Sequence, residues 1–206
     1  MADKLDLRSI LNMGPQPEFM MELPAGWSRR EVTDETYRDF EASLKRNLMQ
    51  AHQPQTYSVL GPGLRDSFDK MRNAGAVAFF APIDAPADAP RMAASIIARY
   101  RRSEDGQPLD DHVRKLIRDR GAQSLLGDRR TVRYEEEVDV RLGEGRFVNH
   151  SITYLTPVPE SRRLKALELV ASLVRPAGIS RESERLVAQK DLMDLMVASL
   201  RWVKQN

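Results

Sequence analysis

Hydrophobic and charged residues alternate with a period of two along residues 131–142. The apolar positions are Val132, Tyr134, Val138, Val140 and Leu142, and the charged positions between them are Arg133, Glu135, Glu137, Asp139 and Arg141. Successive side chains of a β-strand point to opposite faces of its sheet. The pattern therefore predicts a strand whose apolar face is buried and whose charged face lies in water.

This strand is predicted to be the first of three. The sequence Gly143-Glu144-Gly145 indicates a tight turn, because glycine accepts the positive φ that short hairpin loops need. A second strand is expected over residues 146–156, before Pro157 removes a backbone donor, and a third over residues 164–174. The rest of the chain is expected to cover the sheet that these strands begin.

The remaining patterns predict further strands and amphipathic helices. Strands are expected at 19–23, 27–32, 76–80 and 92–100, and helices at 34–49, 64–73, 109–121 and 180–203. The sequence Gly61-Pro62-Gly63 is interpreted as the lead-in to the second helix. The resulting order, β-β-α-α-β-β-α-β-β-β-α, predicts an α+β fold with a mainly antiparallel central sheet. Residues 1–18 are expected to form an N-terminal arm and residues 19–206 a single domain.

Three short motifs resemble those of one protein superfamily. Phe19, Leu23, Pro24, Gly26 and Trp27 form a Phe-x-x-x-Leu-Pro-x-Gly-Trp sequence, residues 154–159 read Tyr-Leu-Thr-Pro-Val-Pro, and residues 199–202 read Ser-Leu-Arg-Trp. Together with the order of elements, these motifs are similar to the PsbP-like superfamily and in particular to its bacterial DcrB- and LpqN-like members. The resemblance implies an α/β/α sandwich that binds other macromolecules and catalyses no reaction. The matching positions are turn and packing residues, so the resemblance assigns no functional residue.

Composition narrows the class of protein. The chain has 206 residues, of which 41% are hydrophobic and 30% charged, with a formal net charge of +2 and no cysteine. These fractions are typical of a globular protein, and the lack of cysteine excludes a disulfide scaffold and thiolate chemistry. Because no stretch has the pattern of a signal peptide or a membrane span, we expect a cytoplasmic bacterial protein. No motif predicts a cofactor or a metal ion.

Glu136 and His150 are the strongest candidates for chemistry. Glu136 interrupts the apolar face of its strand, and His150 lies between apolar residues of the returning strand. With residues 143–145 left unpaired in the turn, Glu136 is expected diagonally across from His150, within reach of long side chains. A carboxylate that holds an imidazole is half of an acid–base site, which would have Tyr134 and Tyr154 in its walls. A packed polar pair without chemistry is the alternative interpretation.

The final predicted helix is the best candidate for an interaction surface. Its apolar residues outside the main apolar stripe are Leu192, Leu195, Met196 and Trp202. Apolar surfaces that contain methionine adapt to partners, so these residues are expected to contact another protein or a second copy of the chain. Coverage by neighbouring loops or by the N-terminal arm is the alternative.

A cluster of arginines raises a third possibility. Its members are Arg91, Arg99, Arg101, Arg102, Arg129, Arg130 and Arg133. Such a ridge would suit nucleic acid, but aromatic stacking platforms do not interleave with it. The sequence therefore favours a non-enzymatic protein-binding or scaffold protein, a class that includes secretion-system accessory and immunity-type proteins. A small-ligand site or enzyme centred on Glu136 and His150, and a nucleic-acid site on the ridge, are the alternatives.

Overall fold

A seven-stranded antiparallel sheet forms the centre of the protein. The computed structural model describes residues 16–83, 93–103, 106–142 and 145–203. The strands, in spatial order, are β2 (Ser28–Arg30), β3 (Ala76–Ala81), β4 (Ala93–Arg102), β8 (Lys165–Pro176), β7 (Gly145–Pro157), β6 (Asp128–Leu142) and β5 (Gln123–Leu125). The three long strands predicted after residue 130 are therefore neighbours in the sheet. The short strand β5 was not predicted.

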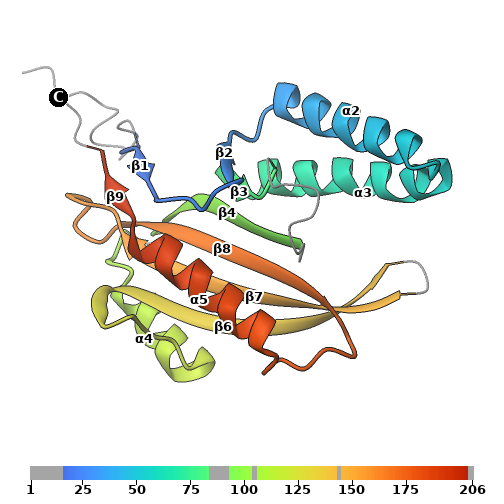
Figure 1. The fold of residues 1–206 in the computed structure, drawn as a ribbon. Helices are drawn as coiled ribbons and strands as arrows, with labels where there is room; N and C mark the ends of the chain where they lie inside the picture. The colour runs from blue at the N-terminus through green and yellow to red at the C-terminus, as the bar shows by residue number, and fades with distance from the viewer. Residues whose placement is uncertain (1–15, 84–92, 104–105, 143–144, 204–206) are drawn as a thin grey trace, which may run out of the picture.

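Helices cover both faces of this sheet. One face carries α5 (Glu184–Ala198), and the other carries α2 (Asp34–Gln50), α3 (Pro54–Asn73) and α4 (Asp110–Arg120). Figure 1 shows α5 lying along the sheet, with the α2–α3 pair beside β3 and β4, and α4 beside β6. The coarse prediction of an α+β fold with a mainly antiparallel sheet is confirmed. None of the helices in the described part is long and apolar enough to cross a membrane.

The main hydrophobic core lies between α5 and the sheet. Strand residues that alternate along β4, β7 and β8 meet the buried side of the helix, and each is removed almost completely from water. Its largest fully buried members include Ile96, Ile152, Leu167, Leu169, Leu173, Leu186 and Met193. Burying each side chain of this size contributes about 1.5–3 kcal/mol, so this layer supplies much of the driving force for folding.

A smaller aromatic core holds the α2–α3 pair against the opposite face. Tyr37 and Phe40 of α2, Phe68 of α3 and Phe79 of β3 stack edge-on or tilted, with ring centroids 5.5–6.0 Å apart. Thr33 caps α2, since its hydroxyl accepts a hydrogen bond from the Thr36 amide at 3.1 Å. Among the described residues Tyr37 is the one buried residue of α2, and the buried part of this core consists of Tyr37, Phe68 and Phe79.

The chain ends differently from the prediction. The predicted helix at 180–203 is confirmed only over Glu184–Ala198, and it is followed by strand β9 (Arg201–Trp202), which pairs with β1 (Phe19–Met20). The edge of the Trp202 ring packs on Phe19, with centroids 6.3 Å apart. The amide of Glu22 also donates to the Ser199 hydroxyl at 2.8 Å, just where the helix ends. Contacts with the N-terminal segment therefore outweigh local helix propensity here.

Helix α3 also differs from the prediction. It begins at Pro54, ten residues before the predicted start, and continues through Gly61-Pro62-Gly63. Proline inside a helix removes one backbone hydrogen bond, which makes these residues look like a helix boundary. Gly61 is buried against the ring of Tyr57, so packing supports the turn that the sequence disfavours. The predicted N-terminal arm, 1–18, lies for its first fifteen residues outside the described residues.

Candidate functional site

The structure separates the two residues that were predicted to pair. In the β6–β7 ladder Leu142 lies opposite Gly145, so Glu137 lies opposite His150 and Glu136 lies opposite Ser151. This register differs by one residue from the prediction, and such a slip moves every side chain of a strand to the other face. The prediction that Glu136 reaches His150 was therefore wrong.

The same slip reverses the predicted faces of β6. Tyr134 and Glu136 lie on the side of α4, where Glu136 forms an ion pair with Arg120. Val138, expected in the core, is 58% exposed, because it lies beyond the end of α4. Arg133, Glu135 and Glu137 instead lie on the side of α5, together with His150 and Tyr154 of β7.

His150 is buried at the centre of an ionic cluster beneath α5. The imidazole is 1% exposed, and its Nδ1 lies 2.9 Å from Oε1 of Glu137. Its Nε2 lies 2.9 Å from Oε2 of Glu135, close enough for an ion pair but out of line for a hydrogen bond. Arg175 of β8 donates from Nη2 to the same Glu137 oxygen at 3.0 Å, and Lys190 of α5 reaches Glu135 at 2.8 Å.

Asp194 of α5 forms the other half of this cluster. Its Oδ1 accepts hydrogen bonds from the Tyr154 hydroxyl at 2.6 Å and from Nε of Arg133 at 2.8 Å. Arg133 also contacts Glu135, which joins the two halves. Burial, together with the hydrogen bond to Asp194, raises the pKa of the Tyr154 hydroxyl far above its usual range. Tyr154 is therefore a fixed donor and not an acid at neutral pH.

The cluster satisfies its own charges. Burial opposes ionisation of Glu135, but contacts with the basic side chains of His150, Lys190 and Arg133 outweigh it and hold the pKa of Glu135 well below its usual range. The hydrogen bond from His150 likewise lowers the pKa of Glu137. Since each carboxylate is already bound to a cation, the arrangement suits docking of α5 on the sheet better than proton transfer to a substrate.

Most of the partner-binding residues predicted on the final helix are part of the core. Met196 is buried, and Leu192 and Trp202 pack against the main core. Leu195 is the one residue of these four whose side chain is largely in water, and it is 61% exposed. The four residues therefore do not form one exposed patch, because the sheet and β1 cover more of the helix than the sequence pattern suggested.

The predicted arginine ridge is divided between the two faces of the sheet. Arg99 and Arg101 lie on the face opposite α5 and bind the buried carboxylate of Glu168 at 2.7 and 2.8 Å. Arg133 lies under α5, and Arg130 pairs with Asp128 at 3.0 Å. Arg91 lies outside the described residues. These ion pairs leave much less free positive charge than the sequence suggests.

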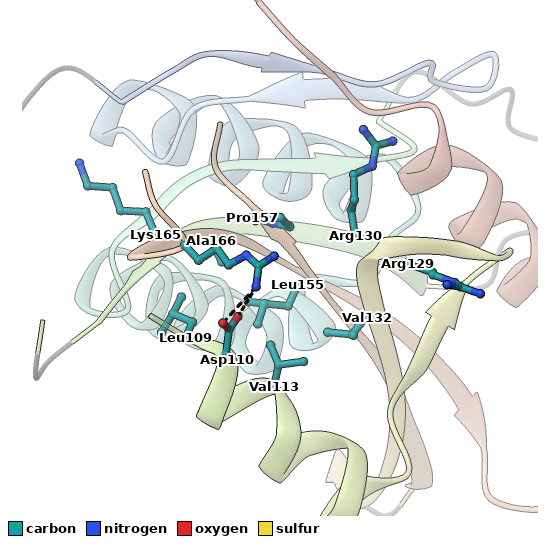
Figure 2. A pocket seen from close by; sticks show the side chains of 11 residues that line it. Leu109, Asp110, Val113, Arg129, Arg130, Val132, Leu155, Pro157, Lys165 and Ala166 are labelled. Atoms are coloured by element: carbon teal, nitrogen blue, oxygen red, sulfur yellow. Dashed lines mark hydrogen bonds and ion pairs between the residues drawn. The ribbon is translucent and has the colours of Figure 1, made fainter. Parts of the chain in front are cut away.

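A small cleft lies between α4 and the end of the sheet. Figure 2 shows its apolar walls, which include Val113, Val132 and Leu155, and a volume of about 230 Å³ lies between them. Arg163 also lines the cleft, and its Nη1 donates to Oδ2 of Asp110 at 3.0 Å. Both side chains of this pair are largely exposed, at 69% and 46%, and Arg129, Arg130 and Lys165 also line the cleft.

A much larger cavity, which we call the hairpin groove, lies between α3 and the face of the sheet opposite α5. Its volume is about 730 Å³. Its apolar lining consists of Phe40, Leu64, Phe68, Met71, Ala74, Phe79, Ala81, Ile97 and Val170, and its polar lining consists of Ser67, Lys70, Ser95, Arg99, Asn149 and Ser172. The helix pair forms one wall and strands β4, β8 and β7 form the floor. The groove exists because α2 and α3 pack mainly against β3, and no helix of the described residues fills the space between them and strands β4, β8 and β7.

Two polar groups of the hairpin groove have capacity for a ligand. Oδ1 of Asn149 is buried and has no hydrogen-bond partner among the described residues. Lys70 pairs with Asp66 at 2.6 Å, but both side chains are largely exposed, so this pair is weak and open to competition. In the part of the chain that the structure describes, the lining holds no carboxylate and no histidine. The groove can therefore accept an apolar body that carries a hydrogen-bonding group and a negative charge.

Little in the sequence indicated this groove. Its floor residues Ser95, Ile97, Val170 and Ser172 alternate along their strands like ordinary half-buried positions. The groove depends on where the α2–α3 pair ends relative to the sheet, and no local pattern encodes that. For the ionic cluster a signal did exist, because Lys190 and Asp194 lie four residues apart on the face of the final helix that carries Leu186 and Met193.

Comparisons with protein-family models and with curated proteins find no match for this chain. No family is therefore established by sequence. Within the described ranges, no group of three or more potential metal ligands of the histidine, cysteine, aspartate or glutamate type is brought together. The geometry of the hairpin groove and of the ionic cluster is therefore the best guide to the function of this chain.

Proposed function

We propose that this protein is a non-enzymatic binding protein that holds an amphipathic segment of a partner protein in the hairpin groove. The observation that supports this most directly is an open apolar groove on a part of the sheet that no helix of the described ranges covers. In an α/β/α arrangement a helix would be expected over strands β4, β8 and β7. An amphipathic helix from a partner would complete that layer by the helix-in-groove mode of recognition.

The lining indicates the chemistry of the partner. Ile97, Val170 and Met71 favour an apolar helix face. Lys70 at the rim, with no carboxylate among the described lining residues, favours an acidic residue beside that face. The unpaired Oδ1 of Asn149 favours a donor such as an amide or a hydroxyl, because a buried acceptor without a partner costs about 1–3 kcal/mol.

The proposal agrees with the expectation that the PsbP-like resemblance raised, namely binding of macromolecules without catalysis. Membership of that superfamily, a bacterial source and a cytoplasmic location are part of the proposal. A role as a secretion-system accessory or immunity-type protein would be one form of it. Binding of a small amphiphile is the second candidate, because a groove of about 730 Å³ lies within the usual range for ligand sites of roughly 300–1,000 Å³.

The test is selection of helical peptides from a displayed library on the purified protein, followed by titration of the enriched peptides. Ser172→Arg places a long side chain on the groove floor without removing a core residue, and Lys70→Glu reverses the charge at the rim. We expect acidic amphipathic peptides that bind the wild type, and roughly tenfold or greater loss of affinity in both variants.

Leu195→Arg is the matched control, because it adds the same charge at an exposed apolar site on the other side of the molecule. Peptide affinity should be unchanged in this variant. Equal binding to wild type and Ser172→Arg, or enrichment of no peptide, would refute the proposed function. If decanoate binds the wild type and not Ser172→Arg while no peptide is enriched, the ligand is a small amphiphile.

A further inference from the structure

The outer edge of β6 is open over much of its length. β5 pairs only with the first part of β6, and the last paired residue is Arg133. From Tyr134 to Leu142 no described strand lies on that side, although β7 pairs along the whole other side. Alternate residues of such an edge direct their backbone N–H and C=O groups outwards with no strand to receive them.

The far end of this edge also exposes apolar side chains. Val138 is 58% and Val140 39% exposed, although valine is favoured in strands mainly because it packs. Figure 1 shows that this end of the β6–β7 hairpin projects beyond α4 and α5. The helices therefore leave the segment Val138–Arg141 accessible to another chain.

The charges on this segment are complementary to each other. Among the described residues Asp139 and Arg141 have no ion-pair partner, whereas Glu135, Glu136 and Glu137 are all held by cations of their own chain. Asp139 and Arg141 are two positions apart, so their side chains lie on the same face of the strand. One residue, Val140, lies between them.

We propose that the open edge of β6 pairs antiparallel with the same edge of a second copy, about a two-fold axis at Val140. In this register Val140 lies opposite Val140 of the other copy, and Asp139 of each copy lies opposite Arg141 of the other. Val138 then lies opposite the backbone of Leu142. Two sets of exposed opposite charges and the exposed valines are paired at once, and the two sheets become continuous across the axis.

Other registers fit the sequence less well. An axis at Val138 would place Glu137 opposite Asp139, and an axis at Asp139 would place that carboxylate opposite its own copy. Like charges directly opposite each other destabilise a strand pair. The site is separate from the hairpin groove, so this proposal does not depend on the proposed function.

The decisive experiment exchanges the two charges. Asp139→Arg alone would place arginine opposite arginine, and Arg141→Asp alone would place aspartate opposite aspartate. We expect the wild type to dimerise in sedimentation equilibrium, and each single variant to dimerise at least about tenfold more weakly. An equimolar mixture of the two single variants should dimerise again, because all its cross-copy pairs are of opposite charge. The double variant Asp139→Arg/Arg141→Asp should also recover the wild-type constant.

Arg114→Asp serves as the control, since it reverses an exposed charge on α4, away from the edge, and should leave dimerisation unchanged. The substituted side chains on β6 are exposed, and each variant should be folded, which circular dichroism checks. A wild type that stays monomeric up to about 100 µM, well above the micromolar constants of weak specific complexes, would overturn the proposal. The proposal would also be overturned if the single variants dimerised as strongly as the wild type, or if their equimolar mixture failed to dimerise.

Discussion

Among single residues, Glu168 combines burial with charge. Its side chain is 6% exposed on β8, and it accepts hydrogen bonds from Arg99 and Arg101 of β4. Burial opposes its ionisation, but the two guanidinium groups outweigh that effect and hold the pKa of Glu168 below its usual range. The carboxylate therefore links the two central strands on the face opposite α5.

Replacing this carboxylate should be costly. Glu168→Gln leaves two arginines beside an uncharged amide, and breaking a buried ion pair from one side costs up to about 3–5 kcal/mol. Because each arginine is about one-third exposed, with side-chain values of 34% and 33%, water offsets part of the loss. We expect the free energy of unfolding in urea to fall by about 1–3 kcal/mol.

Asp119→Asn, which removes an exposed partner of Arg118, is the control for Glu168→Gln. Its free energy of unfolding should change by less than about 0.5 kcal/mol. An equal effect of the two substitutions would show that the buried link between β4 and β8 contributes no more than a surface pair.

Among the elements, α5 is attached to the sheet by charge as well as by apolar packing. Glu135 and Glu137, whose pKa values are lowered in the folded state, face His150, Arg133 and Arg175. Lys190 and Asp194 of the helix complete the cluster. The attachment of α5 to the sheet is therefore expected to weaken at acidic pH.

The sign of this response follows from the direction of the shifts. A carboxyl whose pKa is lower in the folded state stabilises the fold above its unfolded-state pKa of about 4.3, and this contribution is lost as the pH falls below that value. We expect the contribution of these two carboxylates to the free energy of unfolding in urea to be nearly constant from pH 7 to about 5.5 and to fall below about pH 5. The Glu135→Gln variant should have a lower free energy of unfolding than the wild type at pH 7 and lose less of it in acid. The control Glu182→Gln, on the exposed loop before α5, should have the same free energy of unfolding as the wild type at each pH. Parallel curves for wild type and Glu135→Gln would contradict this account.

Helix α3 contains a glycine that lowers its stability, and replacing this residue should stabilise the helix. Gly63 lies within the helix, and a Cβ atom added there would meet nothing within 4 Å. Gly63→Ala should therefore raise the free energy of unfolding by about 0.5–1 kcal/mol, because alanine loses less backbone entropy on entering a helix. Gly75, with a φ of +69°, is the contrasting site, and Gly75→Ala should lower the melting temperature. A lower melting temperature for Gly63→Ala would contradict the prediction.

These elements also show what the sequence could and could not predict. Alternation in 131–142 identified β6, and the run at 76–80 identified β3, because period and length are local properties. A difference of one residue in the turn decides which residues of β6 share a face with His150. The prediction therefore placed Glu136 beside His150, whereas Glu137 occupies that position. Strand β9 was missed because its conformation is set by pairing with β1, which no local pattern reveals. The first ten residues of α3 were missed because Gly61-Pro62-Gly63 has the local pattern of a helix boundary.

At the scale of the whole molecule, stability is expected to be unequal between two parts. The sheet and α5 share the large core, whereas the α2–α3 pair is held mainly by the aromatic core around Phe68 and Phe79. Regions with few buried apolar contacts open locally at a lower free energy than the rest of the protein. The wall of the hairpin groove is therefore the part of the molecule best able to adjust to a partner.

Hydrogen exchange of the native protein tests this inequality. Amides of α2 and α3 should open with a free energy at least about 1.4 kcal/mol below that of β7 and β8, which corresponds to a tenfold faster exchange. Phe68→Ala should release the helix pair while protection in β7 and β8 persists, because its cost of about 3–5 kcal/mol falls on the small core. Phe80→Ala, in the main core, should instead lower protection throughout the sheet. If Phe68→Ala lowered protection equally in β8 and α3, the two cores would form one cooperative unit. The groove wall would then be a rigid surface, and its partner would have to fit the groove without adjustment of the helix pair.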